Sequence, residues 1–67
     1  MIEWHKVDHR ANTTWQLMVN GAYRGIVERT NGHWFVRSMQ LGVFDRRVDT
    51  LEEGKAVLEA VAALNHA

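Results

Sequence analysis

The chain has 67 residues, of which 46% are hydrophobic and 24% charged, and its formal net charge at pH 7 is zero. This composition is typical of one small globular domain, residues 1–67, and it excludes a disordered chain and a strongly basic nucleic-acid-binding protein. The chain has no cysteine, which excludes disulfides and thiolate metal sites and is compatible with a reducing cytoplasm.

Membrane segments are not expected. No apolar run approaches the roughly 20 residues that a membrane-spanning helix needs, and the first six residues, MIEWHK, lack the apolar region of a signal peptide. We therefore expect no membrane association and a cytoplasmic location. A core of this size supplies only about 3–5 kcal/mol of net stability, so a homodimer is one expected source of further support.

The first two thirds of the chain predict strands. Residues 2–7 are a candidate for a short strand, residues 10–13 for a loop, and whether residues 1–9 cover a sheet face stays open. Residues 14–19 place Trp15, Leu17 and Val19 on one side, with the period of two that is typical of a strand. Asn20-Gly21 predicts a two-residue hairpin turn, because both central residues need a positive φ. Further strands are predicted at residues 22–29 and 33–38, with a short one at 41–44.

The register between these strands depends on the two turns. A two-residue first turn pairs Trp15 with Ile26, and paired residues share a sheet face. We predict a three-residue second loop, Thr30-Asn31-Gly32, because it pairs Ile26 with Val36 and keeps the tryptophans on one face. The face expected to be covered then consists of Trp15, Leu17, Val19, Ala22, Ile26, Trp34 and Val36.

A C-terminal helix is predicted from Leu51 to Leu64. Thr50 and Glu53 have the spacing of a capping box, and apolar residues recur behind them at helical spacing. Gly54 lies within the apolar stripe, which we interpret as close approach of the helix to the sheet. The predicted fold class is therefore α+β, an antiparallel β-meander of three or four strands with one C-terminal α-helix packed on one face.

One helix covers only one face of such a sheet, so the other face is the candidate binding surface. Apolar side chains alternate on it with polar and basic ones. The predicted partner-binding residues are Met18, Tyr23, Val27, Arg29, His33, Phe35 and Arg37.

Catalytic and metal-binding patterns are weak. His5 and His9 have a helical metal-ligand spacing, but in a strand they lie about 13 Å apart. Ser38 is the one serine in the sequence and has no glycine elbow, and Glu52 and Glu53 are explained by helix capping. We expect no enzyme activity, no cofactor and no metal site.

Four stretches share the spacing of one DNA-binding domain type: Tyr23-Arg24-Gly25-Ile26; Arg29, Gly32 and Trp34; Leu41-Gly42-Val43-Phe44-Asp45; and Asp49-Thr50-Leu51-Glu52-Glu53-Gly54. Over residues 23–62 the chain resembles the plant ethylene-response-factor domain and the arm-type-site binding domains of phage integrases. The resemblance implies a three-stranded sheet, backed by one helix, that lies in the DNA major groove. Arg24 and Arg29 match positions of the family that contact DNA.

The chain also departs from that family pattern. Val27, Asn31 and Met39 replace arginine, tryptophan and arginine, Arg37 replaces glutamate, and Arg46-Arg47-Val48 is inserted. The nucleic-acid-binding residues of this alternative are Arg24, Arg29, Arg37, Arg46 and Arg47, whose guanidinium groups suit phosphates and guanine edges.

A protein-binding module is the favoured prediction. Interfaces are enriched in aromatic residues, methionine and arginine and depleted in lysine, and the chain has only Lys6 and Lys55. It resembles the compact accessory or inhibitor proteins of phages and mobile elements. We predict a non-catalytic module that acts through protein contacts or self-association on the uncovered face, with double-stranded DNA binding as the alternative.

Overall fold

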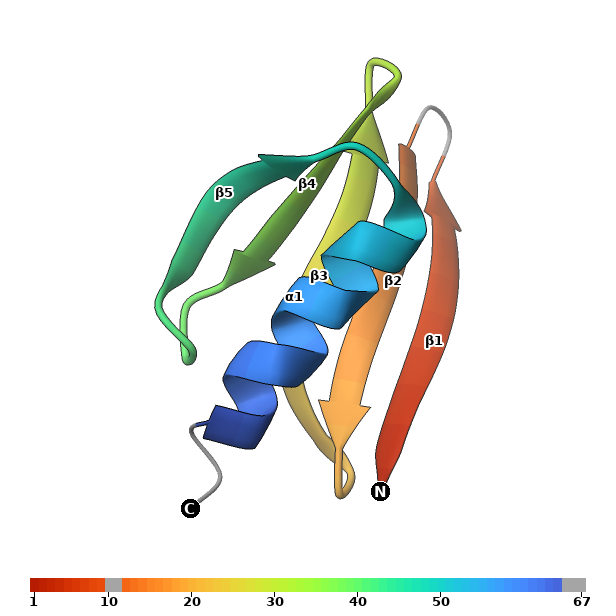
Figure 1. The fold of residues 1–67 in the computed structure, drawn as a ribbon. Helices are drawn as coiled ribbons and strands as arrows, with labels where there is room; N and C mark the ends of the chain where they lie inside the picture. Colours follow the sequence, from red (N-terminus) through yellow and green to blue (C-terminus); the bar gives the residue numbers. More distant parts are fainter. Residues whose placement is uncertain (10–11, 65–67) are drawn as a thin grey trace.

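The computed structural model describes residues 1–9 and 12–64. In this part of the chain five strands form one sheet, β1 (Ile2–His9), β2 (Asn12–Val19), β3 (Ala22–Thr30), β4 (His33–Ser38) and β5 (Val43–Val48), followed by helix α1 (Leu51–Leu64). The strands follow one another in the order β1-β2-β3-β4-β5, and every neighbouring pair is antiparallel. Figure 1 shows α1 running across one face of this meander. The predicted α+β class is confirmed.

The sheet has more strands than the three or four predicted. The N-terminal segment pairs with β2 along its whole length, from Ile2 opposite Val19 to His9 opposite Asn12, so it extends the sheet instead of covering it. The last strand spans Val43–Val48 and not 41–44. Of the loop predicted at residues 10–13, residues 12 and 13 belong to β2, and residues 10–11 lie outside the described part.

Both predicted hairpins have two-residue turns. Asn20 and Gly21 have φ values of 51° and 81°, and Asn31 and Gly32 have φ values of 52° and 78°. These positive values at both central positions match the mirror-image turn that suits twisted strands. The three-residue loop predicted at Thr30-Asn31-Gly32 is therefore wrong, since Thr30 lies directly opposite His33.

A β-bulge explains this error. Leu17 lies opposite Gly25, but the next residue, Met18, lies opposite Tyr23, so Arg24 is an extra residue in β3. The bulge moves the rest of β3 by one position, and a shift of one residue exchanges the two faces of a strand. Trp15 therefore pairs with Val27 and not with Ile26.

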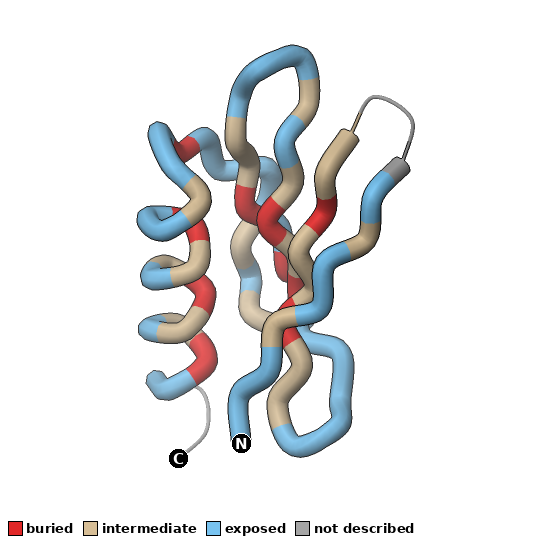
Figure 2. The backbone as a smooth tube through the Cα atoms, turned by 90° about the vertical axis from the view of Figure 1, so that its right-hand side faces the viewer, coloured by how far each residue is buried: buried red, intermediate tan, exposed pale blue. Residues whose placement is uncertain are grey.

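The core lies between α1 and the sheet. Its buried apolar residues are Leu17, Val27, Val36, Val48, Leu58 and Ala62. Helix α1 packs on β3, β4 and β5, and Figure 2 shows that its buried positions are turned towards the sheet. A Cβ atom added at Gly54 would lie 2.7 Å from Cγ1 of Val27, which confirms the expected close approach of the helix.

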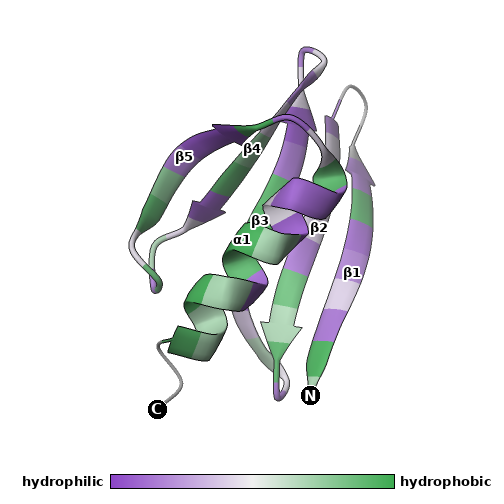
Figure 3. Ribbon diagram, in the orientation of Figure 1, coloured by the Kyte–Doolittle hydropathy of each residue, from purple (hydrophilic) through white to green (hydrophobic). Residues whose placement is uncertain are grey.

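The helix begins with the predicted cap. The Glu53 N–H donates to Thr50 Oγ1 at 3.1 Å, and the Glu53 carboxylate accepts from the Asp49 N–H at 3.2 Å. Figure 3 shows a hydrophilic first turn followed by largely hydrophobic turns. In the described part of the chain, no helix has the length and apolarity required to cross a membrane.

Candidate functional site

The sheet side opposite α1, called the open face below, is built from cross-strand rows. Directly opposed residues share a face, so the pairing registers define each row. One row consists of Val7, Thr14, Glu28, Phe35 and Arg47; the next consists of His5, Gln16, Ile26 and Arg37; the third consists of Glu3, Met18 and Tyr23. Apolar and charged side chains are therefore interleaved across the sheet.

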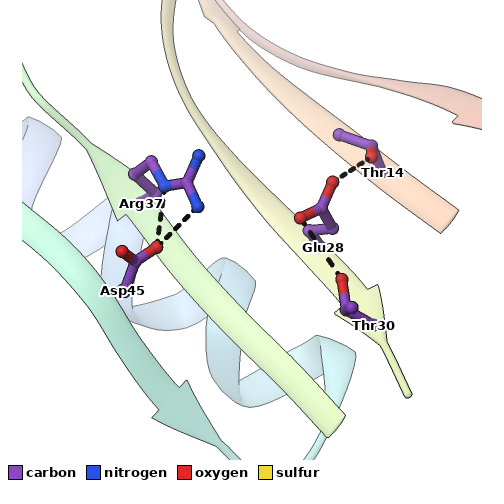
Figure 4. A network of polar contacts seen from close by, with 5 residues as sticks. All are labelled: Thr14, Glu28, Thr30, Arg37 and Asp45. Carbon is purple, nitrogen blue, oxygen red and sulfur yellow. Dashed lines mark hydrogen bonds and ion pairs between the residues drawn. The ribbon is translucent and has the colours of Figure 1, made fainter. Parts of the chain in front are cut away.

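A carboxylate is fixed near the middle of this face. Glu28 accepts hydrogen bonds from the hydroxyl of Thr14 at 3.1 Å and from that of Thr30 at 3.3 Å. Thr14 is itself buried. Figure 4 looks onto these groups with α1 behind the sheet. The two hydroxyls therefore hold the Glu28 carboxylate in one position on the open face.

An ion pair lies beside this group. The Nε and Nη2 atoms of Arg37 both lie 2.7 Å from Oδ1 of Asp45 (Figure 4). The hydrogen bond that Arg37 donates to Asp45, together with the negative charge of Asp45, raises the pKa of Arg37 above its ordinary value. Asp45 has a φ of 44° and lies where the register of β4 with β5 shifts, so the irregular backbone of β5 positions the carboxylate.

Two shallow hollows flank Arg37. One has a volume of about 290 Å³ and is lined by Glu28, Thr30, Phe35, Arg37 and Asp45. The other has a volume of about 270 Å³ and is lined by Tyr23, Arg37, Ser38, Met39 and Gln40. Tyr23 and Met39 are 46% and 77% exposed. We call Tyr23, Phe35, Arg37, Met39 and Asp45 the Arg37 patch.

Five of the seven predicted partner-binding residues lie on the open face: Met18, Tyr23, His33, Phe35 and Arg37. Val27 was placed wrongly, because it lies in the core with 0% exposure. Arg29 was also placed wrongly, since it pairs with Trp34 on the helix side, although it is exposed. Both errors follow from the bulge at Arg24, which exchanges the faces of the later β3 residues.

Other open-face residues were missed. Ile26 was assigned to the core face and lies opposite Arg37. Glu28, Asp45 and Met39 were not singled out, because an acidic residue in a strand or a methionine in a turn is ordinary in sequence. Thr30 lies two residues after Glu28 in β3, but Thr14 comes from β2, so only the register brings Thr14 to Glu28.

The arginines of the DNA-binding alternative do not gather on one face. Arg37 and Arg47 lie on the open face, where Arg47 Nη2 donates to Nδ1 of His33 at 2.9 Å. Arg29 and Arg46 lie on the helix side, opposite Trp34 and Val36. Arg24 is the extra residue of the bulge.

The Ser38 hydroxyl has structural contacts within the fold. Ser38 is 2% exposed, and its hydroxyl donates to the Arg24 carbonyl and accepts from the Leu41 N–H. Within residues 1–9 and 12–64, no three acidic or histidine side chains are grouped to hold a metal ion. The His5–His9 pair lies partly outside this description, because the side chain of His9 is not included in it.

Comparison of the chain with models of protein families, with curated proteins and with solved structures finds no match. The resemblance to DNA-binding domains therefore stays a prediction from sequence.

Proposed function

We propose that this chain is a non-catalytic binding module that contacts another protein through its open face, centred on the Arg37 patch. The observation that carries the proposal is the exposure of Tyr23 and Met39, which line one hollow together with Arg37. Aromatic residues, methionine and arginine are the types enriched at protein interfaces. As part of the same proposal we place the protein in the cytoplasm, as an accessory or inhibitor protein.

The order of the open face supports a binding role. Glu28 is held by two hydroxyls, and Arg37 is held by Asp45. Side chains that are already fixed lose less conformational entropy when a partner binds. A partner meets an apolar surface with oriented charges of both signs, which favours a protein over a polyanion.

The engagement of Ser38 supports a non-catalytic role. Both hydrogen-bonding functions of its hydroxyl are used within the fold, one by the Arg24 carbonyl and one by the Leu41 N–H. A serine nucleophile needs an exposed hydroxyl and a neighbouring base. Ser38 has neither the exposure nor a free hydroxyl.

The experiment is affinity capture from nuclease-treated lysate of the source organism, with the wild-type chain and two variants as baits. Tyr23→Asp combined with Met39→Asp adds two charges to the Arg37 patch at exposed positions, so the fold should persist. The matched control is Leu64→Asp, because Leu64 is an exposed apolar residue at the end of α1. We expect a protein that the wild type and the control retain and that the Tyr23/Met39 variant loses by more than tenfold.

The same interaction is then measured with the purified partner by calorimetry. Equal binding to the wild type and to the Tyr23/Met39 variant would place the interface elsewhere. Retention of nucleic acid alone, in lysate without nuclease, would favour the DNA-binding alternative.

A further inference from the structure

The two edges of the sheet differ. The β5 edge is irregular, because its register with β4 shifts and Asp45 has a positive φ. Such irregularities protect an edge from further pairing. The β1 edge has eight residues in unbroken register with β2, and its described residues include no proline and no positive φ.

The backbone groups that β1 leaves free can be identified. The Asn20 N–H donates to the Met1 carbonyl at 2.9 Å, so the carbonyl of Met1 points towards β2. In an antiparallel ladder the N–H and C=O groups of successive residues point alternately to the two sides. The groups of the even-numbered residues, Ile2, Trp4, Lys6 and Asp8, therefore point away from β2. In the described part of the chain no other strand pairs with this side.

We infer that this edge binds a second copy of the chain, with the two β1 strands antiparallel about a twofold axis at His5. In this register Trp4 faces Lys6 of the second copy, and Ile2 faces Asp8 of the second copy. All four outward-pointing residues are then matched, and the two sheets form one continuous sheet. The inference does not rest on the proposed function, which concerns the open face.

Side-chain pairing selects this register, and in it the edge is self-complementary, which makes a second copy the occupant. An axis at Lys6 would place two lysines directly opposite each other, which is destabilising. An axis at Trp4 would leave the backbone groups of Asp8 without partners. With the axis at His5 the two His5 side chains are opposed, neither Lys6 nor Asp8 faces a like charge, and each Lys6 lies opposite Trp4 of the other copy, a favourable cation–π arrangement. Lysine already lies over tryptophan within the chain, with Lys55 Nζ 4.1 Å from the centroid of Trp15.

Cysteine crosslinking tests the register directly, since the native chain has no cysteine. His5→Cys should form a disulfide-linked dimer under mild oxidation, because opposed residues at the axis lie within the roughly 4.4–6.8 Å between Cα atoms that a disulfide spans. Glu3→Cys and Val7→Cys should crosslink with each other when mixed, but neither should crosslink efficiently alone. Efficient crosslinking of Glu3→Cys with His5→Cys, or no crosslink in any combination, would overturn the inference.

Light scattering with a proline variant tests the edge. Lys6→Pro removes an N–H that points away from β2, and proline is tolerated on an edge strand in this position. The native chain of 7.7 kDa should elute with the mass of two copies, and Lys6→Pro should elute with the mass of one. Lys6→Thr keeps the N–H and should remain largely dimeric, and circular dichroism checks that each variant is folded.

A native chain that is monomeric up to millimolar concentration would overturn the inference, as would a folded Lys6→Pro variant that is still dimeric. Tyr23→Asp with Met39→Asp should leave the dimer intact. That result allows the dimer inference and the proposed function to be tested separately, because each variant changes only the β1 edge or only the open face.

Discussion

Asp45 holds its backbone in a conformation that disfavours residues with a Cβ atom. Its φ of 44° lies in the left-handed region, which costs an L-residue roughly 1–2 kcal/mol. Asp45→Gly and Asp45→Ala both remove the ion pair with Arg37, so they differ only at the backbone. Glycine also adds about 0.5–1 kcal/mol of unfolded-state entropy, so we expect the alanine variant to be less stable than the glycine variant by about 0.5–1 kcal/mol. Urea denaturation measures the difference, and an alanine variant that is more stable than the glycine variant would show that the Asp45 backbone is not strained.

Residue roles within β4 were predictable, whereas that of Asp45 was not. Trp34 and Val36 alternate with Phe35 and Arg37 in an uninterrupted strand, so the period of two assigns each side chain to its face. Asp45 contacts Arg37 only because β5 changes register and Asp45 takes a positive φ. No local residue pattern in the sequence predicts this shift of register.

At the scale of elements, the helix and the sheet are fitted to each other at Gly54. Helix propensity alone predicts that Gly54→Ala stabilises α1 by about 1 kcal/mol. The added Cβ would lie 2.7 Å from Cγ1 of Val27 and 3.2 Å from Cγ2 of Val36, in a core where overpacking costs about 1–3 kcal/mol. We expect Gly54→Ala to lower the free energy of unfolding by about 1 kcal/mol, measured by urea denaturation.

The matched control is Ala60→Gly, at an exposed position of the same helix. It should lower the stability by about 1 kcal/mol through helix propensity alone. If Gly54→Ala and Ala60→Gly both lower the free energy of unfolding, the loss at Gly54 comes from packing and the loss at Ala60 from helix propensity. A stabilising Gly54→Ala would mean that the helix can move away from β3 and β4 at little cost.

The elements that were predicted correctly have local sequence patterns that identify them. The helix has its cap at Thr50 and uninterrupted helical spacing, and the first hairpin has Asn20-Gly21. The bulge at Arg24 has no such signal, because Tyr23-Arg24-Gly25-Ile26 reads as continuous strand. One missed residue put Ile26 on the wrong face, and the three-residue second loop was then needed to pair it with Val36.

At the scale of the whole molecule, the distribution of charge bears on the choice of partner. Helix α1 carries Glu52, Glu53 and Glu59 against Lys55, so the helix side of the sheet is covered by an acidic element. The arginines of β3, β4 and β5 are divided between the two faces of the sheet. The fold class follows from the periods and caps of the sequence, but the partner depends on which side chains share a face, because one fold serves many functions.

This division of the arginines predicts that DNA binds weakly and that its affinity depends only slightly on salt concentration. Among the arginines of the described residues, Arg37 and Arg47 alone are on the open face, and Glu28 and Asp45 lie beside them. The logarithm of the affinity for a duplex falls with the logarithm of salt concentration by about 0.9 for each phosphate neutralised. We therefore expect a slope of about −2 or shallower in a fluorescence-anisotropy titration with a random duplex.

Two double variants show which face of the sheet is responsible for any DNA binding that is observed. Replacing Arg37 and Arg47 with alanine should abolish the residual affinity, whereas replacing Arg29 and Arg46, on the helix side, should leave it nearly unchanged. A slope of about −4 or steeper, with equal losses in both variants, would mean that arginines from both sides of the sheet contact phosphates together. The DNA-binding alternative would then replace the protein-binding one, because a surface that wraps the edge of the sheet, and not the open face, would be the site.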